Sequence, residues 1–349
     1  MSQEERLQAL NQPLLAWYAE HARSLPWREN PAPYRVWISE IMLQQTRVEA
    51  VKPYFERFVR ELPNATALAF VSDDRLMKLW EGLGYYSRAR NLKKAARQIL
   101  EEYGGEMPAD YEKLKSLPGI GSYTAGAIAS IAFGIPVPAV DGNVLRVVAR
   151  ITAGREDIRK ASTKKQVEQA LLPVIPREHP GTFNQGMMEI GAMVCLPNGE
   201  PRCGDCPFDG ICLSALHHLT GEIPVRTPKK PRRVEDKTVC ILECRNQVGI
   251  RKRGAEGLLA FLYELPNVEG VLQEEELADA FGFSPGEIVR IERLPPAKHI
   301  FSHVEWHMAG YRVVLENRIP SGLIPAQKEE LRTVYALPGA FGAYTKLIH

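Results

Sequence analysis

The first two thirds of the chain carry apolar side chains at helical spacing, and the last third carries shorter apolar runs that are typical of strands. Apolar residues recur every three or four positions in residues 7–24, in Tyr34–Thr46 and in two segments within residues 163–195. Ser72 precedes another such stretch as a favoured N-cap, and Ser87 begins the next one. The pattern therefore predicts a helical N-terminal domain.

The C-terminal third is predicted to mix strands with one or two short helices. The expected strands form two pairs, namely Thr238–Glu243, Val248–Arg253, Glu305–Ala309 and Tyr311–Glu316. A polar turn separates the first pair, and Gly310 is expected to be the turn of the second. A short helix at Glu274–Phe281 is expected between the pairs. This pattern predicts an α+β domain.

A basic, proline-rich segment separates the two patterns. Residues 223–233 read IPVRTPKKPRR, with three prolines and five basic side chains, which favours a stiff, solvated linker. Contact of this segment with a phosphate backbone is an equally open interpretation. The predicted domains are residues 1–222 and 234–349, and 349 residues are enough for two separate cores.

Composition narrows the class of protein but does not identify it. The net charge is +2, so any nucleic-acid-binding surface would have to be local. No apolar run is long enough to span a membrane, and the first ten residues contain acids without the apolar core of a secretion signal. We therefore expect a cytoplasmic protein without a membrane partner, in which cysteines serve as ligands or core residues more often than as disulfides.

The densest motif lies in residues 114–144 and begins with a glycine-rich reversal. Gly119 and Gly121 permit a tight turn and a close approach of the backbone to another molecule. Ser122 is expected to cap the helix that follows. The first backbone N–H groups of such a helix suit a phosphate, because the free donors and the helix dipole act together.

Two carboxyl groups are candidates for chemistry. Asp141 stands twenty residues after Gly121, directly before another helix, where most aspartates act only as caps. Glu40 shares a helix face with apolar residues. It could bend to solvent or pair with an arginine, or it could be a desolvated carboxyl with a raised pKa that donates a proton. The motif around Asp141 favours the second interpretation of Glu40.

Four of the six cysteines form a ligand-like cluster within eighteen residues, at Cys195, Cys203, Cys206 and Cys212. A tetrahedral zinc site is one interpretation. Zinc ribbons usually have two C-x2-C pairs, whereas this segment has one, so an iron–sulfur cluster fits at least as well. Cys240 and Cys244 lie in an apolar run and are expected to be core residues.

Taken together, these motifs resemble the MutY-type adenine DNA glycosylases over essentially the whole chain. WISEIMLQQT, EGLGYYSRARNL, LPGIGSYTAGAIAS, VDGNV and the four cysteines occur in the order of that family. The resemblance implies an all-α helix-hairpin-helix core with an iron–sulfur cluster loop, shared with endonuclease III, and an α+β Nudix-like domain. It further implies removal of adenine mispaired with 8-oxoguanine or guanine in double-stranded DNA, by a monomer with one [4Fe-4S] cluster on the four cysteines.

The resemblance also implies roles for individual residues. Glu40 would protonate the adenine and Asp141 would stabilise the oxocarbenium ion, while Asn143 orients Asp141 and Tyr123 lies against the developing cation. The other implied positions are Trp27, Arg28 and Gln185 in the adenine pocket, Gln45 and Tyr85 in the disturbed base stack, Thr46 and Leu83 near the 8-oxoguanine, Gly119, Gly121 and Ser122 on the DNA backbone, and Phe301, Ser302 and His303 at the 8-oxoguanine. Without the resemblance, the sequence leaves it open whether Leu83 and Tyr85 pack in a core or enter a base stack.

Three details refine this expectation. Tyr123 stands where lyase-active relatives carry a Schiff-base lysine, which predicts a monofunctional enzyme. Residues 257–290 lack the Glu-rich signature of Nudix hydrolases, so we expect binding without nucleotide hydrolysis. Seven residues separate Cys195 from Cys203 where six are usual, an insertion that a loop absorbs at small entropic cost. A non-catalytic DNA-damage sensor is the competing class, and the two carboxyl groups argue against it.

Overall fold

The computed structural model describes residues 1–228 and 231–348, which form two compact units. The first unit comprises Met1–Phe70 and Arg90–Pro228, and the second comprises Val71–Ala89 and Lys229–His349. Two lysines of the expected linker, at 229 and 230, and the last residue lie outside the described residues. The hydrophobic pattern did not predict that Val71–Ala89 groups with the C-terminal strands.

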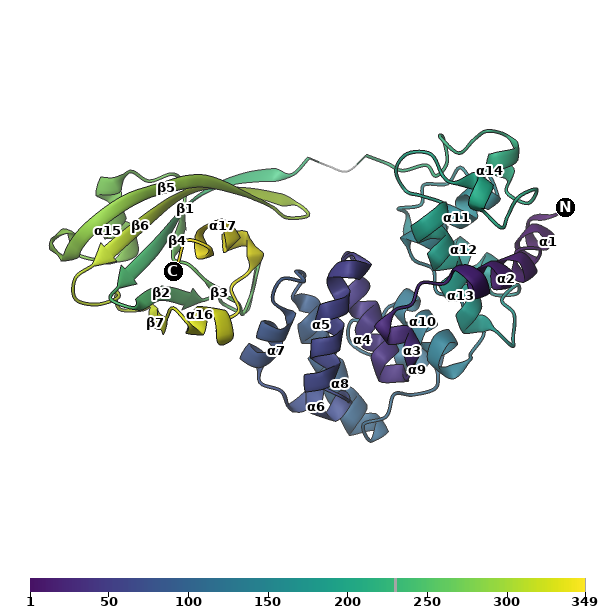
Figure 1. The fold of residues 1–349 in the computed structure, drawn as a ribbon, viewed down its shortest axis with the longest axis horizontal. Coiled ribbons are helices and arrows are strands. Elements are labelled where there is room, and N and C mark those ends of the chain that lie inside the picture. Colours follow the sequence, from purple (N-terminus) through teal and green to yellow (C-terminus); the bar gives the residue numbers. More distant parts are fainter. Residues whose placement is uncertain (229–230, 349) are drawn as a thin grey trace. The chain divides into compact units, whose positions relative to one another are not determined.

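The first unit is all-helical (Figure 1). Its helices are α1 (Gln3–Gln8), α2 (Asn11–His21), α3 (Pro26–Glu29), α4 (Pro33–Leu43), α5 (Val48–Glu61), α6 (Ala65–Phe70), most of α8 (Ser87–Tyr103), α9 (Tyr111–Ser116), α10 (Ser122–Phe133), α11 (Gly142–Ile151), α12 (Ala161–Leu171), α13 (Pro180–Glu189) and α14 (Leu213–Leu216). A π-helical turn at Ile190–Val194 continues α13. No helix in the described part of the chain has both the length and the apolar character needed to cross a membrane.

The apolar stripes seen in the sequence form the core of this unit. Side chains of α1, α2, α11 and α13 pack into one buried cluster that includes Leu10, Val147 and Phe183. The single helix expected over residues 7–24 is wrong, because the chain breaks between α1 and α2. Pro13 explains the break: it lacks the N–H that a continuous helix would need there, but it is tolerated in the first turn of α2.

The second unit is built on a mixed seven-stranded sheet with the main order β3-β2-β1-β6-β5. The strands are β1 (Arg233–Cys244), β2 (Gln247–Lys252), β3 (Tyr263–Glu264), β4 (Asn267–Glu269), β5 (Ile288–Ile300), β6 (Val304–Leu315) and β7 (Ile324–Gln327). The helices of this unit are α7 (Asp73–Trp80), α15 (Leu277–Phe281), α16 (Glu330–Thr333) and α17 (Gly342–Thr345). The predicted hairpin of β1 and β2 is present, whereas β1 and β6 pair in parallel.

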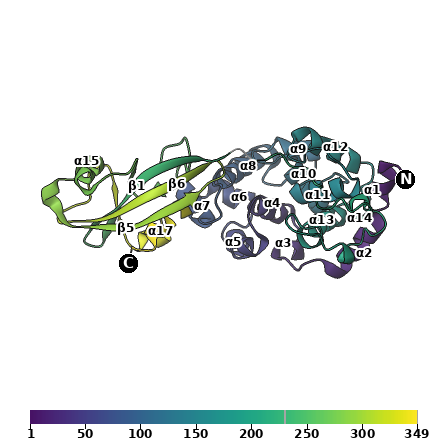
Figure 2. The same ribbon diagram turned by 90° about the horizontal axis from the view of Figure 1, so that it is seen from above.

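Strand β1 is buried on both faces, which explains its unbroken apolar run. Val239 and Ile241 point into the cluster that contains Tyr344 of α17. The alternate residues of the strand point into the opposite cluster, which contains Leu277 of α15. Accordingly, α15 and α17 lie on opposite faces of the sheet (Figure 2).

The turn predicted at Gly310 is wrong, because β6 runs through it without interruption. A Cβ atom at Gly310 would lie 2.3 Å from the Tyr344 ring, so glycine is needed for packing and not for chain reversal. The partner of β6 on its outer side is β5, a long and largely exposed strand that the apolar pattern did not reveal.

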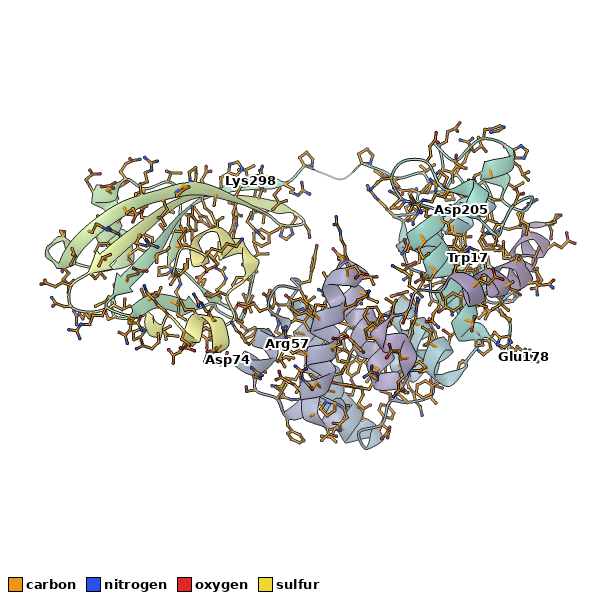
Figure 3. The ribbon with its side chains drawn as sticks, in the orientation of Figure 1. Trp17, Arg57, Asp74, Glu178, Asp205 and Lys298 are labelled. Atoms are coloured by element: carbon orange, nitrogen blue, oxygen red, sulfur yellow. The ribbon has the colours of Figure 1, made fainter. Side chains whose placement is uncertain are left out.

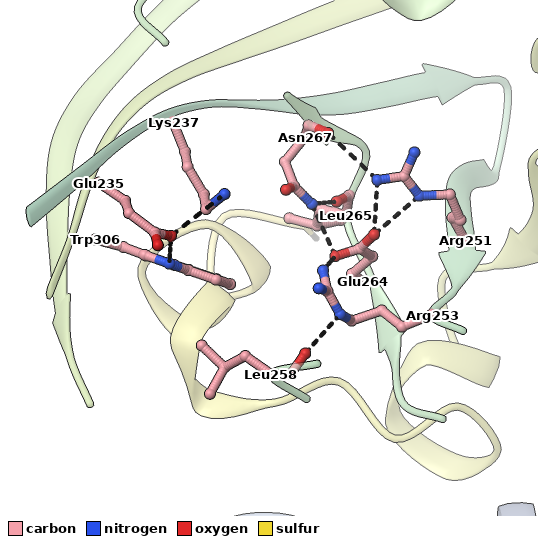
Figure 4. A network of polar contacts seen from close by, with 9 residues as sticks. All are labelled: Glu235, Lys237, Arg251, Arg253, Leu258, Glu264, Leu265, Asn267 and Trp306. Atoms are coloured by element: carbon pink, nitrogen blue, oxygen red, sulfur yellow. Dashed lines mark hydrogen bonds and ion pairs between the residues drawn. The ribbon is translucent and has the colours of Figure 1, made fainter. Parts of the chain in front are cut away.

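A buried carboxylate joins β2 to β3 in the same unit (Figure 4). Glu264 is 1% exposed and accepts hydrogen bonds from Arg251 Nε at 2.9 Å and from Asn267 Nδ2 at 2.9 Å. The Arg253 guanidinium donates to its second oxygen. Both oxygens of the buried carboxylate therefore have partners, which offset the free-energy cost of burying its charge.

Candidate active site

One cavity of about 240 Å³ in the helical unit gathers most of the residues expected to act in catalysis. It is lined by residues of α3, α4, α10, α11 and α13, and the eight predicted residues on its wall are Trp27, Arg28, Glu40, Thr46, Tyr123, Asp141, Asn143 and Gln185. These residues are far apart in the sequence, so the helical fold is what assembles the cavity.

Glu40 lies on α4 and is only 5% exposed. The Tyr123 hydroxyl of α10 donates a hydrogen bond to its Oε2. Burial raises the pKa of Glu40 to about 7, and the negative charge of Asp141 adds to the rise, while the Tyr123 hydrogen bond and Arg28 oppose it. Glu40 is therefore a carboxyl group that carries a proton over part of the neutral pH range.

Asp141 both caps α11 and faces the cavity. Its Oδ1 accepts hydrogen bonds from the backbone N–H groups of Asn143 at 2.9 Å and Val144 at 2.8 Å. Its Oδ2 accepts from Asn143 Nδ2 at 2.8 Å. Burial raises the pKa of Asp141, and these three donors oppose the rise. Its donors favour the ionised form, whereas Glu40 has a single donor, so the two carboxyl groups differ in environment.

A buried arginine connects Asn143 to the cysteine-containing loop. Arg146 Nη2 donates to Asn143 Oδ1 at 2.8 Å and to the Gly191 carbonyl at 2.6 Å, and its Nε donates to the Cys195 carbonyl at 2.8 Å. A Cβ atom at Gly191 would lie 2.4 Å from Asn143 Cβ, so the π-helical turn approaches α11 only because this residue is glycine. The position of Asn143 therefore depends on both contacts.

Glu189 is a cavity residue that the sequence analysis missed. It is 1% exposed, and its Oε1 accepts from Arg28 Nη2 at 2.7 Å and from Arg23 Nη2 at 2.8 Å. Burial alone would raise the pKa of Glu189, but the hydrogen bonds and charges of the two arginines lower it. A lone charge within the apolar run FNQGMMEIGAMVC is the same signal that identified Glu40, so the sequence did contain an indication.

Gln45 and Tyr85, the residues expected in the disturbed base stack, share an unusual backbone. Gln45 has φ 58° and Tyr85 has φ 45°, in the left-handed region that non-glycine residues rarely occupy. Helix α4 ends at Leu43, before Gln45, so the helix expected to reach Thr46 is shorter. Both side chains are exposed, whereas Leu83 is buried. Strained, exposed turns are common where a protein contacts a ligand.

The helix-hairpin-helix comprises α9, the turn at Gly119 and α10. Gly119 has φ 79°, and a Cβ atom there would also lie 2.8 Å from Asn91 Cβ. The expectation that Ser122 caps α10 is wrong: Gly121 is the N-cap, and the Ser122 hydroxyl donates to Glu168 Oε1 at 2.7 Å. No side chain among the described residues caps this N-terminus, which leaves its N–H groups available to an anion.

In the second unit, Phe301, Ser302 and His303 form the turn between β5 and β6. Phe301 packs edge-on against Trp306 at 4.9 Å between ring centroids, while Ser302 and His303 are exposed. The Tyr85 hydroxyl lies 2.8 Å from Ser302 Oγ, within hydrogen-bonding distance. Two turns that the resemblance assigns to the lesion therefore meet within one unit.

The four clustered cysteines line one small cavity of about 40 Å³, and all of them are free thiols. Its other walls are mainly apolar, and Arg150 Nη1 donates to Cys195 Sγ at 3.2 Å. Burial raises the pKa of Cys206 to about 12. Among the described residues, no set of three or more His, Cys, Asp or Glu side chains is placed to hold a metal ion. The fit of a thiolate-bound group therefore rests on the donor set and its shared cavity.

The chain is similar to known DNA repair proteins. Residues 38–177 match the family described as "HhH-GPD superfamily base excision DNA repair protein", and residues 238–346 match the NUDIX domain. The adenine DNA glycosylase of Homo sapiens is 34% identical over 89% of this chain and 68% of its own length. That of Buchnera aphidicola subsp. Baizongia pistaciae is 34% identical over 84% of this chain and 82% of its own.

Solved structures resemble the helical part. A thermostable thymine-DNA glycosylase is 26% identical with a TM-score of 0.55, covering 61% of this chain and 98% of that protein. Endonuclease III in a trapped covalent DNA intermediate is 25% identical with a TM-score of 0.53, covering 63% and 100%. The prediction of a helix-hairpin-helix glycosylase core followed by a Nudix-like domain is confirmed.

Proposed function

Because the chain belongs to the adenine DNA glycosylase family, we propose that its cavity removes adenine mispaired with 8-oxoguanine or guanine from double-stranded DNA. The observation that carries the proposal is the pair of carboxyl groups, Glu40 and Asp141, on one cavity wall in different surroundings. Adenine inside a duplex is out of reach, so the nucleotide must first be flipped out of the stack, at a cost of a few kcal/mol.

Glu40 is the proposed general acid. Its proton goes to the imidazole ring of the adenine, and the glycosidic bond then breaks with both electrons leaving on a neutral base. Its raised pKa supports this role, since an acid with a pKa of about 7 is protonated and reactive near neutral pH. The Tyr123 hydroxyl holds the other side of the carboxyl group and fixes its direction.

Asp141 is the proposed stabiliser of the sugar cation. Its carboxylate, ionised with the help of three N–H donors, attracts the oxocarbenium ion or bonds to it transiently before water adds to the sugar. The proton released by that water returns to the carboxylate pair, so the site is restored. Asn143 orients Asp141, and Tyr123 lies beside both groups.

Recognition of the base is proposed to involve Arg28, Trp27 and Gln185. The bond to Glu189 holds the Arg28 guanidinium at the cavity wall, and its other N–H groups can donate to ring nitrogens of a purine. Glu189 was not predicted from the sequence, and we add it to the base-recognition residues because the structure places it against Arg28. Trp27 adds an aromatic wall that favours a planar base.

The reaction is proposed to stop at the abasic site. Among the described residues that line the cavity, none is a lysine, and Tyr123 occupies the position of the Schiff-base lysine in lyase-active relatives. Borohydride should therefore trap little protein–DNA adduct. A stable adduct in good yield would contradict this part of the proposal.

Cys195, Cys203, Cys206 and Cys212 are proposed to hold one [4Fe-4S] cluster. Four thiols on one mainly apolar cavity are the donor set such a cluster needs, and the group would stabilise the loop that carries them. Ligation would release the thiol protons, since burial raises the pKa of Cys206. Purified protein should be brown with iron and sulfide; a colourless protein with stoichiometric zinc would contradict the assignment.

The test of the main proposal is a single-turnover assay on a duplex with one 8-oxoguanine:A pair, developed with alkali. We expect Glu40→Gln and Asp141→Asn each to lower adenine release by about a thousand-fold or more while the duplex is still bound. Glu20→Gln, on an exposed position of α2, is the matched control and should keep wild-type rates. Binding without adenine release by the wild-type protein would favour a damage sensor.

A further inference from the structure

The segment Val71–Ala89 belongs to the second unit through one face of α7. Asp74, Lys78 and Glu81 follow at i, i+4 and i+7, which places them on the same side of the helix. Each of these side chains contacts the C-terminal strands and helices of that unit. Figure 3 labels Asp74 beside α7.

The first two contacts are ionic or charge-assisted. Asp74 Oδ1 lies 2.7 Å from Lys252 Nζ on β2 and accepts from the Tyr263 hydroxyl at 3.3 Å. Lys78 Nζ donates to the carbonyls of Leu331 at 3.1 Å and Tyr335 at 3.0 Å. The Leu331 carbonyl belongs to α16 and the Tyr335 carbonyl lies just beyond its C-terminal end, where the helix dipole favours a cation.

The third contact directly precedes the exposed turn. Glu81 Oε1 accepts from the Leu337 backbone N–H at 2.7 Å, and its Oε2 lies 2.7 Å from Lys78 Nζ. Gly82 and Gly84 follow with φ 99° and 68°, and Trp80 Nε1 and Arg88 Nη2 each donate to the Gly84 carbonyl at 3.1 Å, so the turn keeps one shape. Glu81 fixes where that turn begins.

We infer that Asp74, Lys78 and Glu81 are positioning residues that fasten the turn at residues 82–86 to the Nudix-like domain, so that Tyr85 at the disturbed base stack and Ser302 at the base opposite the adenine form one rigid surface. The inference rests on the proposed function. Tyr85 OH and Ser302 Oγ are 2.8 Å apart. The β5–β6 hairpin shapes the turn that carries Ser302, and Arg88 shapes the turn that carries Tyr85. The three attachments add the link that holds one turn against the other.

The consequence is specific to the lesion. Asp74, Lys78 and Glu81 do not line the cavity that holds Glu40 and Asp141, so bond cleavage itself does not require them. Under the proposed function, discrimination between 8-oxoguanine and guanine depends on the fixed placement of these two turns, whose Tyr85 and Ser302 side chains meet. A shift of about 1 Å in such an arrangement can cost one to two orders of magnitude.

The first experiment is a charge swap in the full-length protein. Asp74→Lys and Lys252→Asp each place like charges together, and the double variant restores the pair with reversed signs. We expect each single variant to lower the ratio of single-turnover rates, 8-oxoguanine:A over guanine:A, by about ten-fold, and the double variant to recover most of it. Glu222→Arg, which breaks the exposed Arg155–Glu222 pair at 3.1 Å in the helical unit, is the control.

The second experiment keeps the inference testable should a charge reversal unfold the protein. Glu81→Ala removes the acceptor for the Leu337 N–H, whereas Glu81→Gln retains an acceptor oxygen. Only the alanine variant should lose hydrogen-exchange protection at Leu337 and lower the rate ratio. An unchanged ratio in folded variants would overturn the inference, whether the two rates keep their wild-type values or fall equally. If the wild-type protein released no adenine, the proposed function itself would fail instead.

Discussion

In the proposed mechanism, Glu40 and Asp141 are carboxyl groups of one cavity that need opposite protonation states. Glu40 must be protonated to donate, and its pKa is raised to about 7. Asp141 must be ionised to stabilise a cation, and burial raises its pKa against the pull of three N–H donors. We expect the working pH range to lie between the two titrations, and burial, opposed by the cavity's hydrogen bonds, sets its limits.

The pH dependence of adenine release follows from these shifts. The rate should fall as pH rises through about 7, because Glu40 loses its proton, and should fall again in acid, because Asp141 gains one. The Tyr123 hydrogen bond lowers the pKa of Glu40, so Tyr123→Phe should move the alkaline limb to higher pH. Single-turnover rates between pH 5 and 9 measure both limbs. An alkaline limb that stays in place would contradict the assignment of Glu40.

Titration of Glu40 should make the folded protein less stable as the pH rises from 4.5 to about 7. Folding raises the pKa of Glu40 from 4.5 to about 7, so its favourable contribution is complete below pH 4.5 and is lost as pH rises to 7. The loss is about 3 kcal/mol at 1.36 kcal/mol per pH unit. Glu40→Gln should therefore gain unfolding free energy relative to wild type between pH 4.5 and 8 in urea titrations. Glu20→Gln should show no such gain.

At the scale of elements, close approaches between backbones hold the site together. The π-helical turn after α13 contacts Asn143 because Gly191 has no side chain. In the sheet, β6 passes under the Tyr344 ring because Gly310 has none. Both glycines serve packing, and their φ angles are ordinary for any residue.

Substituting Gly191 should impair catalysis more than folding. Gly191→Ala would place a methyl group within 2.4 Å of Asn143 Cβ, which must move together with its hydrogen bond to Asp141. We expect about a hundred-fold slower adenine release with duplex binding retained. Gly221→Ala adds a methyl group to open space and is the control. Wild-type rates in Gly191→Ala would show that Asn143 does not position Asp141.

Substituting Gly310 should affect stability. The added methyl group overlaps the Tyr344 ring, and overpacking of this kind costs about 1–3 kcal/mol. Chemical denaturation of Gly310→Ala measures the loss. Gly286→Ala, at an open position of the same unit, should stay within about 0.5 kcal/mol of wild type. Equal stability of the two variants would contradict the packing explanation.

At the scale of the whole molecule, the sequence predicted both domain types, because helical and strand periodicities are local properties. It also located Glu40, since a charge on an apolar helix face is visible in one window of residues. It missed Glu189 and Arg146, whose roles depend on partners far along the chain. The predicted cap at Ser122 and the predicted turn at Gly310 were wrong for the same reason. Ser122 bonds to Glu168 and Gly310 packs against Tyr344, and these partners lie far away in the sequence.

Global stability should depend on the buried carboxylate of the sheet. Glu264→Ala would leave Arg251 and Arg253 without their shared anion. Because both guanidinium groups reach solvent, the loss is that of the buried hydrogen bonds, about 1–3 kcal/mol. Guanidinium titrations of the full-length protein measure the change in unfolding free energy. Glu222→Ala, on an exposed pair with Arg155, should lose less than about 1 kcal/mol.

The left-handed backbone at Gln45 and Tyr85 limits which amino acids evolution can use there. A substitution must satisfy the side chain's task and also a φ near +50°, which β-branched residues strongly disfavour. Glycine or asparagine would suit the backbone but would have less side-chain volume for the base-stack role that the resemblance implies. Few single-codon changes meet both demands, so these two positions should tolerate less sequence drift than their exposure suggests.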